Sequence, residues 1–220
     1  LVVLANRDEF YERATDAMHW WPDHPHILAG RDLADVKGQA GTWMGLSKTG
    51  RFAALTNVRA PSEKNLDTPT RGEITASFLK SGQTPEQFIH KEGPSFRRYN
   101  GFNFLATDLS LETPSLVWFS NRVQMGESLR PRKIMNPQAL TPGVYGLSNG
   151  MLDTPWPKVQ HRVGAFAQLL AMDTGQFKRA EHYLRMMEDM TQAQDEYLPQ
   201  TGVSYEWEKV LSSAFIRTPN

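Results

Sequence analysis

Short apolar segments that lie in pairs around turn residues constrain the fold of this chain more than any other feature. Residues 42–47 and 52–57 flank Lys48-Thr49-Gly50, and a short connection that contains glycine between two apolar runs predicts a β-hairpin. The other candidate strands are the pair 102–107 and 116–120 and the single segments 1–5 and 144–148. The sequence therefore predicts antiparallel β-sheet.

Helical patterns occupy separate stretches of the chain. Thr84-Pro85 and Thr154-Pro155 each place a capping residue before a proline, which is typical of the first turn of a helix. Further amphipathic segments are residues 73–79 and the stretch that contains Phe177, Ala180, Tyr183, Leu184 and Met187. Because the strands come in hairpins and the helices in separate blocks, this order predicts an α+β fold in one compact domain.

The composition restricts the possible partners. The 220 residues include 24 Lys and Arg and 24 Asp and Glu, so the net charge is zero, which argues against a nucleic-acid partner. The sequence has no cysteine for a disulfide or a thiolate-bound metal, and its histidines suggest no metal site. No apolar run approaches the roughly 20 residues of a membrane span, and the cytoplasm is the expected location. Two basic segments, 97–98 and 130–133, are either a local basic patch or solvated turns.

The first candidate strand ends in a cluster of charges, Asn6-Arg7-Asp8-Glu9. If the strand continues, Asn6 and Asp8 point to one face and Arg7 and Glu9 to the other. Charges at the end of a buried strand cost several kcal/mol unless they are paired or hydrogen-bonded. The cluster is therefore either a structural ion network or a functional site.

Two more candidate strands end in asparagine. Asn57 ends the segment 52–57, with Arg59 two residues later, and Asn149 follows the segment 144–148. An asparagine side chain offers two N–H donors without a charge, which suits a developing oxyanion. The alternative is that each asparagine is a turn residue that tolerates a left-handed backbone.

Five segments taken together resemble the NRDE family, also called the transport-and-Golgi-organisation protein family. They are LANRDEF, GTWMGLSKTGRFAALTNVR, TRGE, YNGFNFLATD and YGLSNGMLDTPWPKV, and they spread over nearly the whole chain. The family is similar to the N-terminal-nucleophile hydrolases. The resemblance therefore implies a four-layer αββα sandwich of two mostly antiparallel sheets flanked by helices. It also implies a single domain over residues 1–220 that lacks family residues at both ends.

The resemblance also implies an active site. In the related hydrolases an N-terminal cysteine attacks the substrate and its own α-amine is the base; that cysteine would lie upstream of Leu1. By resemblance, Arg7 would hold the thiolate and Asp8 the amine. Asn57 would be an oxyanion-hole donor, and Asn149 would contact the amine or the substrate carbonyl.

The sequence leaves three functions open. The family's role implies trafficking of haem or another amphipathic ligand, with haem as a possible cofactor. The expected ligand-binding residues are Asn6, Glu9, Trp20, Trp21, Trp43 and Arg59. The alternatives are a cysteine-dependent amide hydrolase that acts on N-acyl substrates, and a non-enzymatic interaction protein whose charged cluster is structural.

The segment AMHWWPDHPHILAG is the expected ligand loop, because haem packs on aromatic rings and takes an imidazole as an axial ligand. It places His19, His24 and His26 near the two tryptophans. The alternative is a polar loop whose tryptophans cover the edge of the sheet.

Overall fold

The chain forms two compact units, described here from a computed structural model. The structure describes residues 1–34, 41–59, 61, 65, 67–125, 128–133, 136–172 and 179–217. One unit, which we call the sheet unit, contains residues 10–58 and 63–143. The other, which we call the terminal unit, contains residues 1–9, 59–62 and 144–220. Whether residues 1–220 are one domain stays a prediction.

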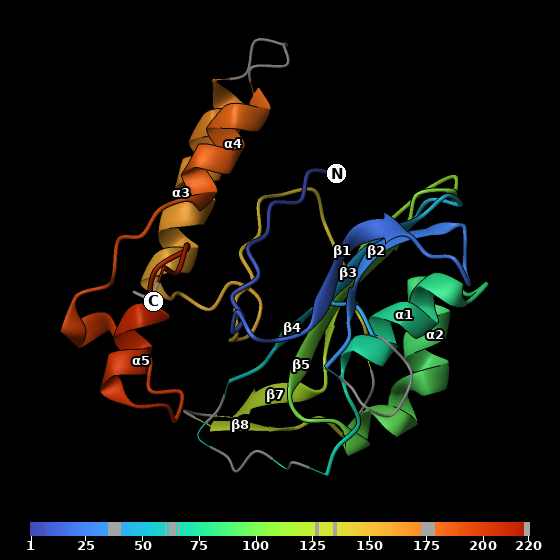
Figure 1. Cartoon of the computed structure of the whole chain (residues 1–220), viewed down its shortest axis with the longest axis horizontal. Coiled ribbons are helices and arrows are strands. Elements are labelled where there is room, and N and C mark those ends of the chain that lie inside the picture. The colour runs from blue at the N-terminus through green and yellow to red at the C-terminus, as the bar shows by residue number, and fades with distance from the viewer. Residues whose placement is uncertain are drawn as a thin grey trace. The chain divides into compact units, whose positions relative to one another are not determined.

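The sheet unit contains a seven-stranded antiparallel sheet (Figure 1) in the order β1-β2-β3-β4-β5-β6-β9. Its strands are β1 (Thr15–Trp20), β2 (Ile27–Asp32), β3 (Met44–Ser47), β4 (Arg51–Asn57), β5 (Phe102–Asp108), β6 (Leu116–Ser120) and β9 (Gln138–Leu140). A two-stranded sheet is formed by β7 (Arg122–Met125) and β8 (Ser128–Pro131). Both predicted hairpins are confirmed: β3 pairs with β4 across a turn in which Gly50 has a φ of 89°, and β5 pairs with β6.

Two helices cover one face of this sheet (Figure 1). Helix α1 (Gly72–Lys80) packs on β2, β3 and β4, and α2 (Pro85–Glu92) packs on β5 and β6. A 3₁₀ helix, η1 (Gly93–Arg98), follows α2. The predicted start of α2 is confirmed, because Thr84 caps the backbone N–H of Gln87 and the Gln87 side chain accepts from the N–H of Thr84.

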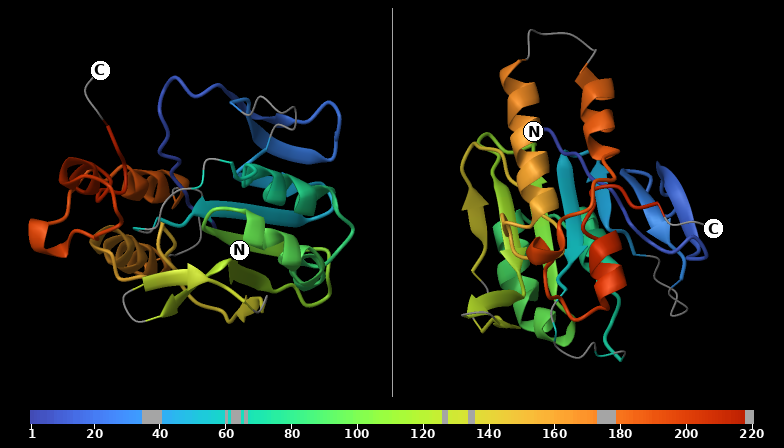
Figure 2. Two further views of the ribbon diagram at one scale, coloured as in Figure 1. Left: turned by 90° about the horizontal axis from the view of Figure 1, so that it is seen from below. Right: turned by 90° about the vertical axis from the view of Figure 1, so that its left-hand side faces the viewer.

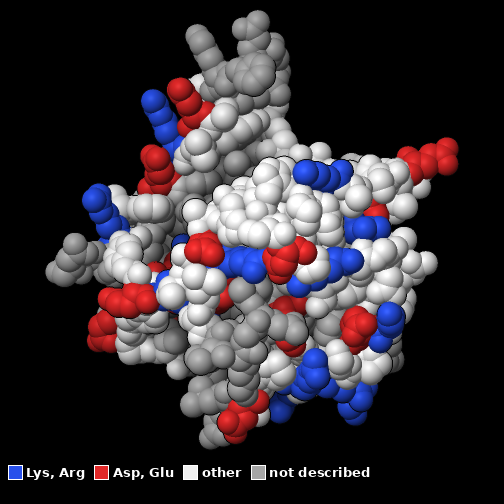
Figure 3. Space-filling model, turned by 45° about the vertical axis from the view of Figure 1, so that its right-hand side comes forward, with Lys and Arg blue, Asp and Glu red and all other residues white. Residues whose placement is uncertain are grey.

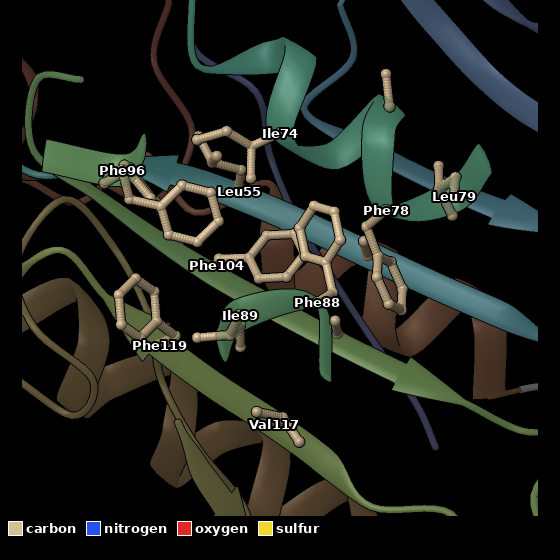
Figure 4. Close-up of a cluster of buried hydrophobic side chains, with 14 of the residues drawn as sticks. Leu55, Ile74, Phe78, Leu79, Phe88, Ile89, Phe96, Phe104, Val117 and Phe119 are labelled. Carbon is tan, nitrogen blue, oxygen red and sulfur yellow. The ribbon is translucent and has the colours of Figure 1, made fainter. Parts of the chain in front are cut away.

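Aromatic rings fill the space between these helices and the sheet (Figure 4). Phe78 of α1 meets Phe88 of α2 and Phe104 of β5 at centroid distances of 5.4 and 5.8 Å. Phe96 of η1 lies 5.7 Å from Phe119 of β6. All five rings are at most 3% exposed, so the aromatic residues fix the helices to the sheet through burial and edge-to-face contacts.

The terminal unit is helical in the residues that the structure describes. It contains α3 (Pro157–Ala171), α4 (Arg179–Met187), the 3₁₀ helix η2 (Asp195–Tyr197) and α5 (Tyr205–Val210). Helices α3 and α4 lie side by side (Figure 2), with the rings of Phe166 and Tyr183 5.4 Å apart. The predicted helix around Tyr183 is confirmed for its described part, while Phe177 lies outside the described residues.

Two predicted strands, residues 1–5 and 144–148, are absent, because no residue described in this unit is in a strand. Leu1 and Val2 are 67% and 53% exposed. A strand needs a row of backbone hydrogen bonds to a neighbouring strand. In the second segment Gly146 instead bonds locally, because its carbonyl accepts from the N–H of Asp153 at 2.8 Å. The prediction that Asp8 follows a buried strand is therefore wrong.

Two local predictions also need correction. Helix α3 begins at Pro157 and not after Thr154, because the Thr154 hydroxyl donates to the carbonyl of Met151 and caps nothing in the helix. The expected loop around Trp20 is the hairpin of β1 and β2. The α+β class is nevertheless confirmed, and the described sheets and helices are compatible with the expected sandwich.

Candidate functional site

Partly buried charges point to candidate sites more clearly than the distribution of charges on the surface does. Acidic and basic side chains are interspersed over most of the face shown in Figure 3. A charge held away from water costs free energy unless something compensates for it. The buried charged and polar groups of each unit are therefore the candidate sites.

Arg59 and Asn149 meet in the terminal unit. The Arg59 backbone N–H donates to the Asn149 carbonyl at 2.7 Å, and Arg59 Nη2 donates to Asn149 Oδ1 at 2.9 Å. The guanidinium lies 5.7 Å from the ring centroid of Trp156. Arg59 Nη1 is buried and has no hydrogen-bond partner among the described residues, so the arginine is only partly satisfied.

Lys158 and Glu208 share the electrostatic environment of this arginine. Lys158 Nζ donates to the carbonyl of Leu211 at 2.7 Å. Glu208 is 5% exposed, and its Oε1 accepts from the N–H and the hydroxyl of Thr201, each at 2.6 Å. Burial lowers the pKa of Arg59, while Glu208 opposes that shift. We call Arg59, Asn149, Lys158 and Glu208 the polar centre of the terminal unit.

The first residues of the chain lie at or near the surface of the terminal unit. Asp8 is exposed, although its charge acts on the pKa values of Arg59 and Lys158. Arg7 and Glu9 form a long ion pair of 3.8 Å with each other. Asn6 holds the segment in place, because its Nδ2 donates to the carbonyls of Met187 and Ala214 at 2.7 and 2.8 Å.

The predicted site residues are divided between the two units. Arg7, Asp8, Arg59 and Asn149 belong to the terminal unit, and the structure brings Arg59 and Asn149 into contact. Asn57 belongs to the sheet unit, where it ends β4 opposite Phe102. The catalytic roles implied for these residues stay predictions.

The three tryptophans that were predicted to bind a ligand all belong to the sheet unit. Trp21 is 1% exposed and donates through Nε1 to the carbonyl of Ala29 at 3.2 Å, so its ring offers little surface to a ligand. Trp20 is 47% exposed and packs against Lys48. Trp43 is partly buried. Across the described residues, no group of three His, Cys, Asp or Glu side chains could hold a metal ion.

An open groove lies between α3 and α4, with a volume of about 390 Å³. Its lining combines apolar and basic side chains: Arg162, Ala165, Gln168, Leu169, Met172, His182, Arg185 and Met186. His182 lies on α4 and lines this groove. Its neighbours could not be read from the sequence, because they come from two helices that meet only in the folded unit.

The pKa of Lys158 predicts how the free energy of unfolding depends on pH. Burial, and then the charge of Arg59, lower the pKa of Lys158 from 10.5 to about 8. The unfolded chain therefore binds more protons than the folded one between these pH values, so the free energy of unfolding should rise with pH across that window. At about 1.4 kcal/mol per pKa unit, the rise is about 3 kcal/mol.

Urea denaturation from pH 7 to 11 tests this rise. In Lys158→Met the rise with pH should be absent, whereas Lys91→Met, which replaces an exposed lysine, should retain it. A wild-type curve parallel to that of Lys158→Met would contradict the prediction.

The described residues thus define an α+β protein with a helix-covered antiparallel sheet and partly buried basic centres. The family model "Transport and Golgi organisation 2" matches residues 1–220, and the chain belongs to this family. The match confirms the resemblance to the NRDE family that the five sequence segments indicated.

Curated relatives carry the same family name. The "Transport and Golgi organization protein 2 homolog" of Bos taurus is 40% identical over 160 residues, which are 72% of this chain and 54% of the relative. The Homo sapiens homolog is 38% identical over the same shares. The Drosophila melanogaster protein is 26% identical over 170 residues, 73% of this chain and 56% of its own. The chain spans about half the length of the curated relatives it matches. Within the described part of the chain, every helix is too short or too polar to cross a lipid bilayer.

Proposed function

We propose that this chain binds an amphipathic ligand that carries carboxylate groups, with haem as the leading candidate, in the groove between α3 and α4. The observation that carries the proposal is the mixed lining of this groove. Leu169, Met172 and Met186 supply apolar surface, and His182 and Arg185 supply polar groups. Its volume of about 390 Å³ falls in the range of small-molecule sites.

The charges of the groove favour an anion. Arg162 is already compensated, because its Nη2 lies 2.6 Å from Asp189 Oδ2 and its Nη1 donates to the Met186 carbonyl at 2.5 Å. Among the described residues, Arg185 has no carboxylate within ion-pair distance. A guanidinium binds carboxylates through paired hydrogen bonds, so Arg185 suits the acidic end of such a ligand.

The residues of the groove also fit haem. An imidazole is a common axial ligand of haem iron, and a thioether can serve as well, so His182 would bind the metal of this cargo. Apolar side chains of α3 would contact the porphyrin, while Arg185 would contact a propionate. Met172 is 76% exposed, and burial of such surface by the ligand would favour binding.

A haem titration tests the proposal. Ferric haem added to the full chain should give a saturable one-to-one change in the Soret band. His182→Ala should weaken binding about tenfold or more and shift the band, since it removes the axial nitrogen. His161→Ala is the matched control. His161 is exposed like His182, but it lies on α3 and does not line the groove. A titration without saturation, or equal losses in the two variants, would refute this site.

A second candidate function is hydrolysis of an N-acyl amide by a cysteine that would precede Leu1. The bond from Arg59 to Asn149 Oδ1 favours it, because it orients the amide so that its N–H groups lie opposite the arginine. Such donors could contact a substrate carbonyl. A protein that carries the family's cysteine should then cleave an N-acyl amide, and Asn149→Asp should abolish turnover; the absence of cleavage across a range of acyl lengths would remove this candidate.

A further inference from the structure

Two arginines of the sheet unit hold their guanidinium groups on backbone carbonyls. Arg71 Nη1 donates to the carbonyl of Gly101 at 3.1 Å, and Arg122 Nη1 donates to the carbonyl of Asn121 at 3.3 Å. Both side chains are partly buried. No carboxylate of the described residues lies within ion-pair distance of either guanidinium, so two positive charges lack a counter-charge there.

Both arginines lie at the same end of the sheet. Gly101 precedes β5, and its carbonyl also accepts from the N–H of Val58 at 2.9 Å, directly after Asn57. Arg122 Cγ lies 3.4 Å from the position that a Cβ on Gly101 would occupy. Arg71 and Arg122 therefore flank one glycine, next to the end of β4.

The position of Arg71 is set by close backbone packing. Arg71 precedes α1, and the first residue of that helix, Gly72, contacts Gly41 so closely that a Cβ on Gly41 would be 2.7 Å from the Gly72 carbonyl carbon. The carbonyl of Gly72 also accepts from the N–H of Thr42 at 3.1 Å. The backbone from which the Arg71 side chain extends is therefore anchored to the segment before β3.

A third arginine is close but already neutralised. Arg13 makes a two-pronged bond to Asp32, with Nε 3.1 Å from both carboxylate oxygens and Nη2 2.7 Å from Oδ2. Burial, followed by the charges of Arg122 and Arg13, lowers the pKa of Arg71 to about 10. Burial alone lowers the pKa of Arg122. These shifts mean that the positive charges are held at a cost, which a bound anion would offset.

We propose that Arg71 and Arg122 form an oxyanion site beside Asn57 that takes the phosphate group of an anionic ligand. Two guanidinium groups without a counter-charge are matched by a group that carries two negative charges, and a phosphate monoester approaches this near neutral pH. A carboxylate would leave one charge uncompensated. The planar guanidinium groups can each give two parallel hydrogen bonds to phosphate oxygens.

The phosphate site is independent of the proposed haem groove. The arginine pair belongs to the sheet unit, and the groove of α3 and α4 belongs to the terminal unit. A haem titration without binding would therefore not contradict the phosphate site, and a phosphate titration without binding would not contradict the groove.

Titration with inorganic phosphate tests the site. Calorimetry on the full chain should show saturable binding of phosphate at constant ionic strength. Phosphate should raise the melting temperature more than sodium chloride of equal ionic strength, and acetate should bind at least tenfold more weakly than phosphate. Arg71→Gln and Arg122→Gln should each weaken phosphate binding about tenfold. Arg71→Lys, which keeps the charge but loses the paired bonds, should fall between wild type and Arg71→Gln.

Arg97→Gln is the matched control, because Arg97 also bonds a backbone carbonyl, that of Lys133 at 2.8 Å, but is exposed. It should bind phosphate like the wild type. The inference is overturned if wild type shows no saturation, if acetate binds as tightly as phosphate, or if Arg97→Gln loses as much affinity as Arg71→Gln. The wild-type comparison of phosphate with acetate decides the question even if a variant fails to fold.

Discussion

Replacing Asn121 with alanine is expected to lower the free energy of unfolding by about 3–5 kcal/mol. This side chain lies between η1 and the start of β5 and is 2% exposed. Its Nδ2 donates to the carbonyls of Phe96, Tyr99 and Asn100 at 3.1–3.3 Å, and its Oδ1 accepts from the N–H of Phe102 at 2.9 Å. Alanine would leave these backbone groups unpaired in a site that excludes water, and each such group costs about 1–3 kcal/mol.

Two further substitutions make this expectation specific to the hydrogen bonds. Asn121→Asp keeps the acceptor for Phe102 but loses the donors and places a carboxylate against three carbonyls, so it should destabilise at least as much as alanine. Asn136→Ala removes an exposed asparagine and should change stability by less than about 0.5 kcal/mol. Urea denaturation measures all three. An Asn121→Ala protein within about 1 kcal/mol of wild type would contradict the assigned role.

Replacing Phe96 with alanine is expected to cost about 3–5 kcal/mol, because the change opens a cavity at the centre of the aromatic core. Phe96 is 2% exposed. Its ring lies 5.4 Å from Phe102, 5.7 Å from Phe119, 6.2 Å from Phe88 and 6.5 Å from Tyr99. The loss includes both the apolar area and the contacts between rings.

The control for the aromatic core is Phe10→Ala. Phe10 is 67% exposed, so the same chemical change should leave the midpoint of urea denaturation nearly unchanged. Phe96→Leu should recover part of the stability that alanine loses, because leucine refills some of the volume. If Phe96→Ala and Phe10→Ala shift the midpoint equally, the core does not depend on this ring.

The hairpins and helices that could be predicted are those whose signals lie within a few residues. The apolar runs on both sides of Lys48-Thr49-Gly50 form β3 and β4, and Thr84-Pro85 begins α2. The same signal at Thr154-Pro155 gave a wrong start for α3. The Thr154 hydroxyl donates to the carbonyl of Met151, and the helix begins at Pro157. A cap requires a geometry that the residue type alone does not guarantee.

The candidate site could be predicted in part. Asn149 and Arg59 were expected to be functional, and the structure joins them by a hydrogen bond. Lys158 and Glu208 could not be found from the sequence. Lys158 donates to the carbonyl of Leu211, which is 53 residues away. Glu208 is the buried residue of α5, while Tyr205 and Trp207 of the same helix are exposed, so no apolar pattern marks its position. Trp21 looked like a ligand contact beside several histidines, but the hairpin buries its ring in the core.

The sequence by itself determined the family, the α+β class and the hairpin of β3 and β4, because motif order, turn residues and periodic apolar positions act over short distances. Only the tertiary structure decided that residues 1–5 form no strand and that Arg71 and Arg122 flank Gly101 with no described carboxylate within ion-pair distance. Strand formation needs a partner for every backbone group, and the cost of a charge depends on the burial and the neighbours that folding creates. Both are properties of residues far apart in the chain, which no local pattern contains.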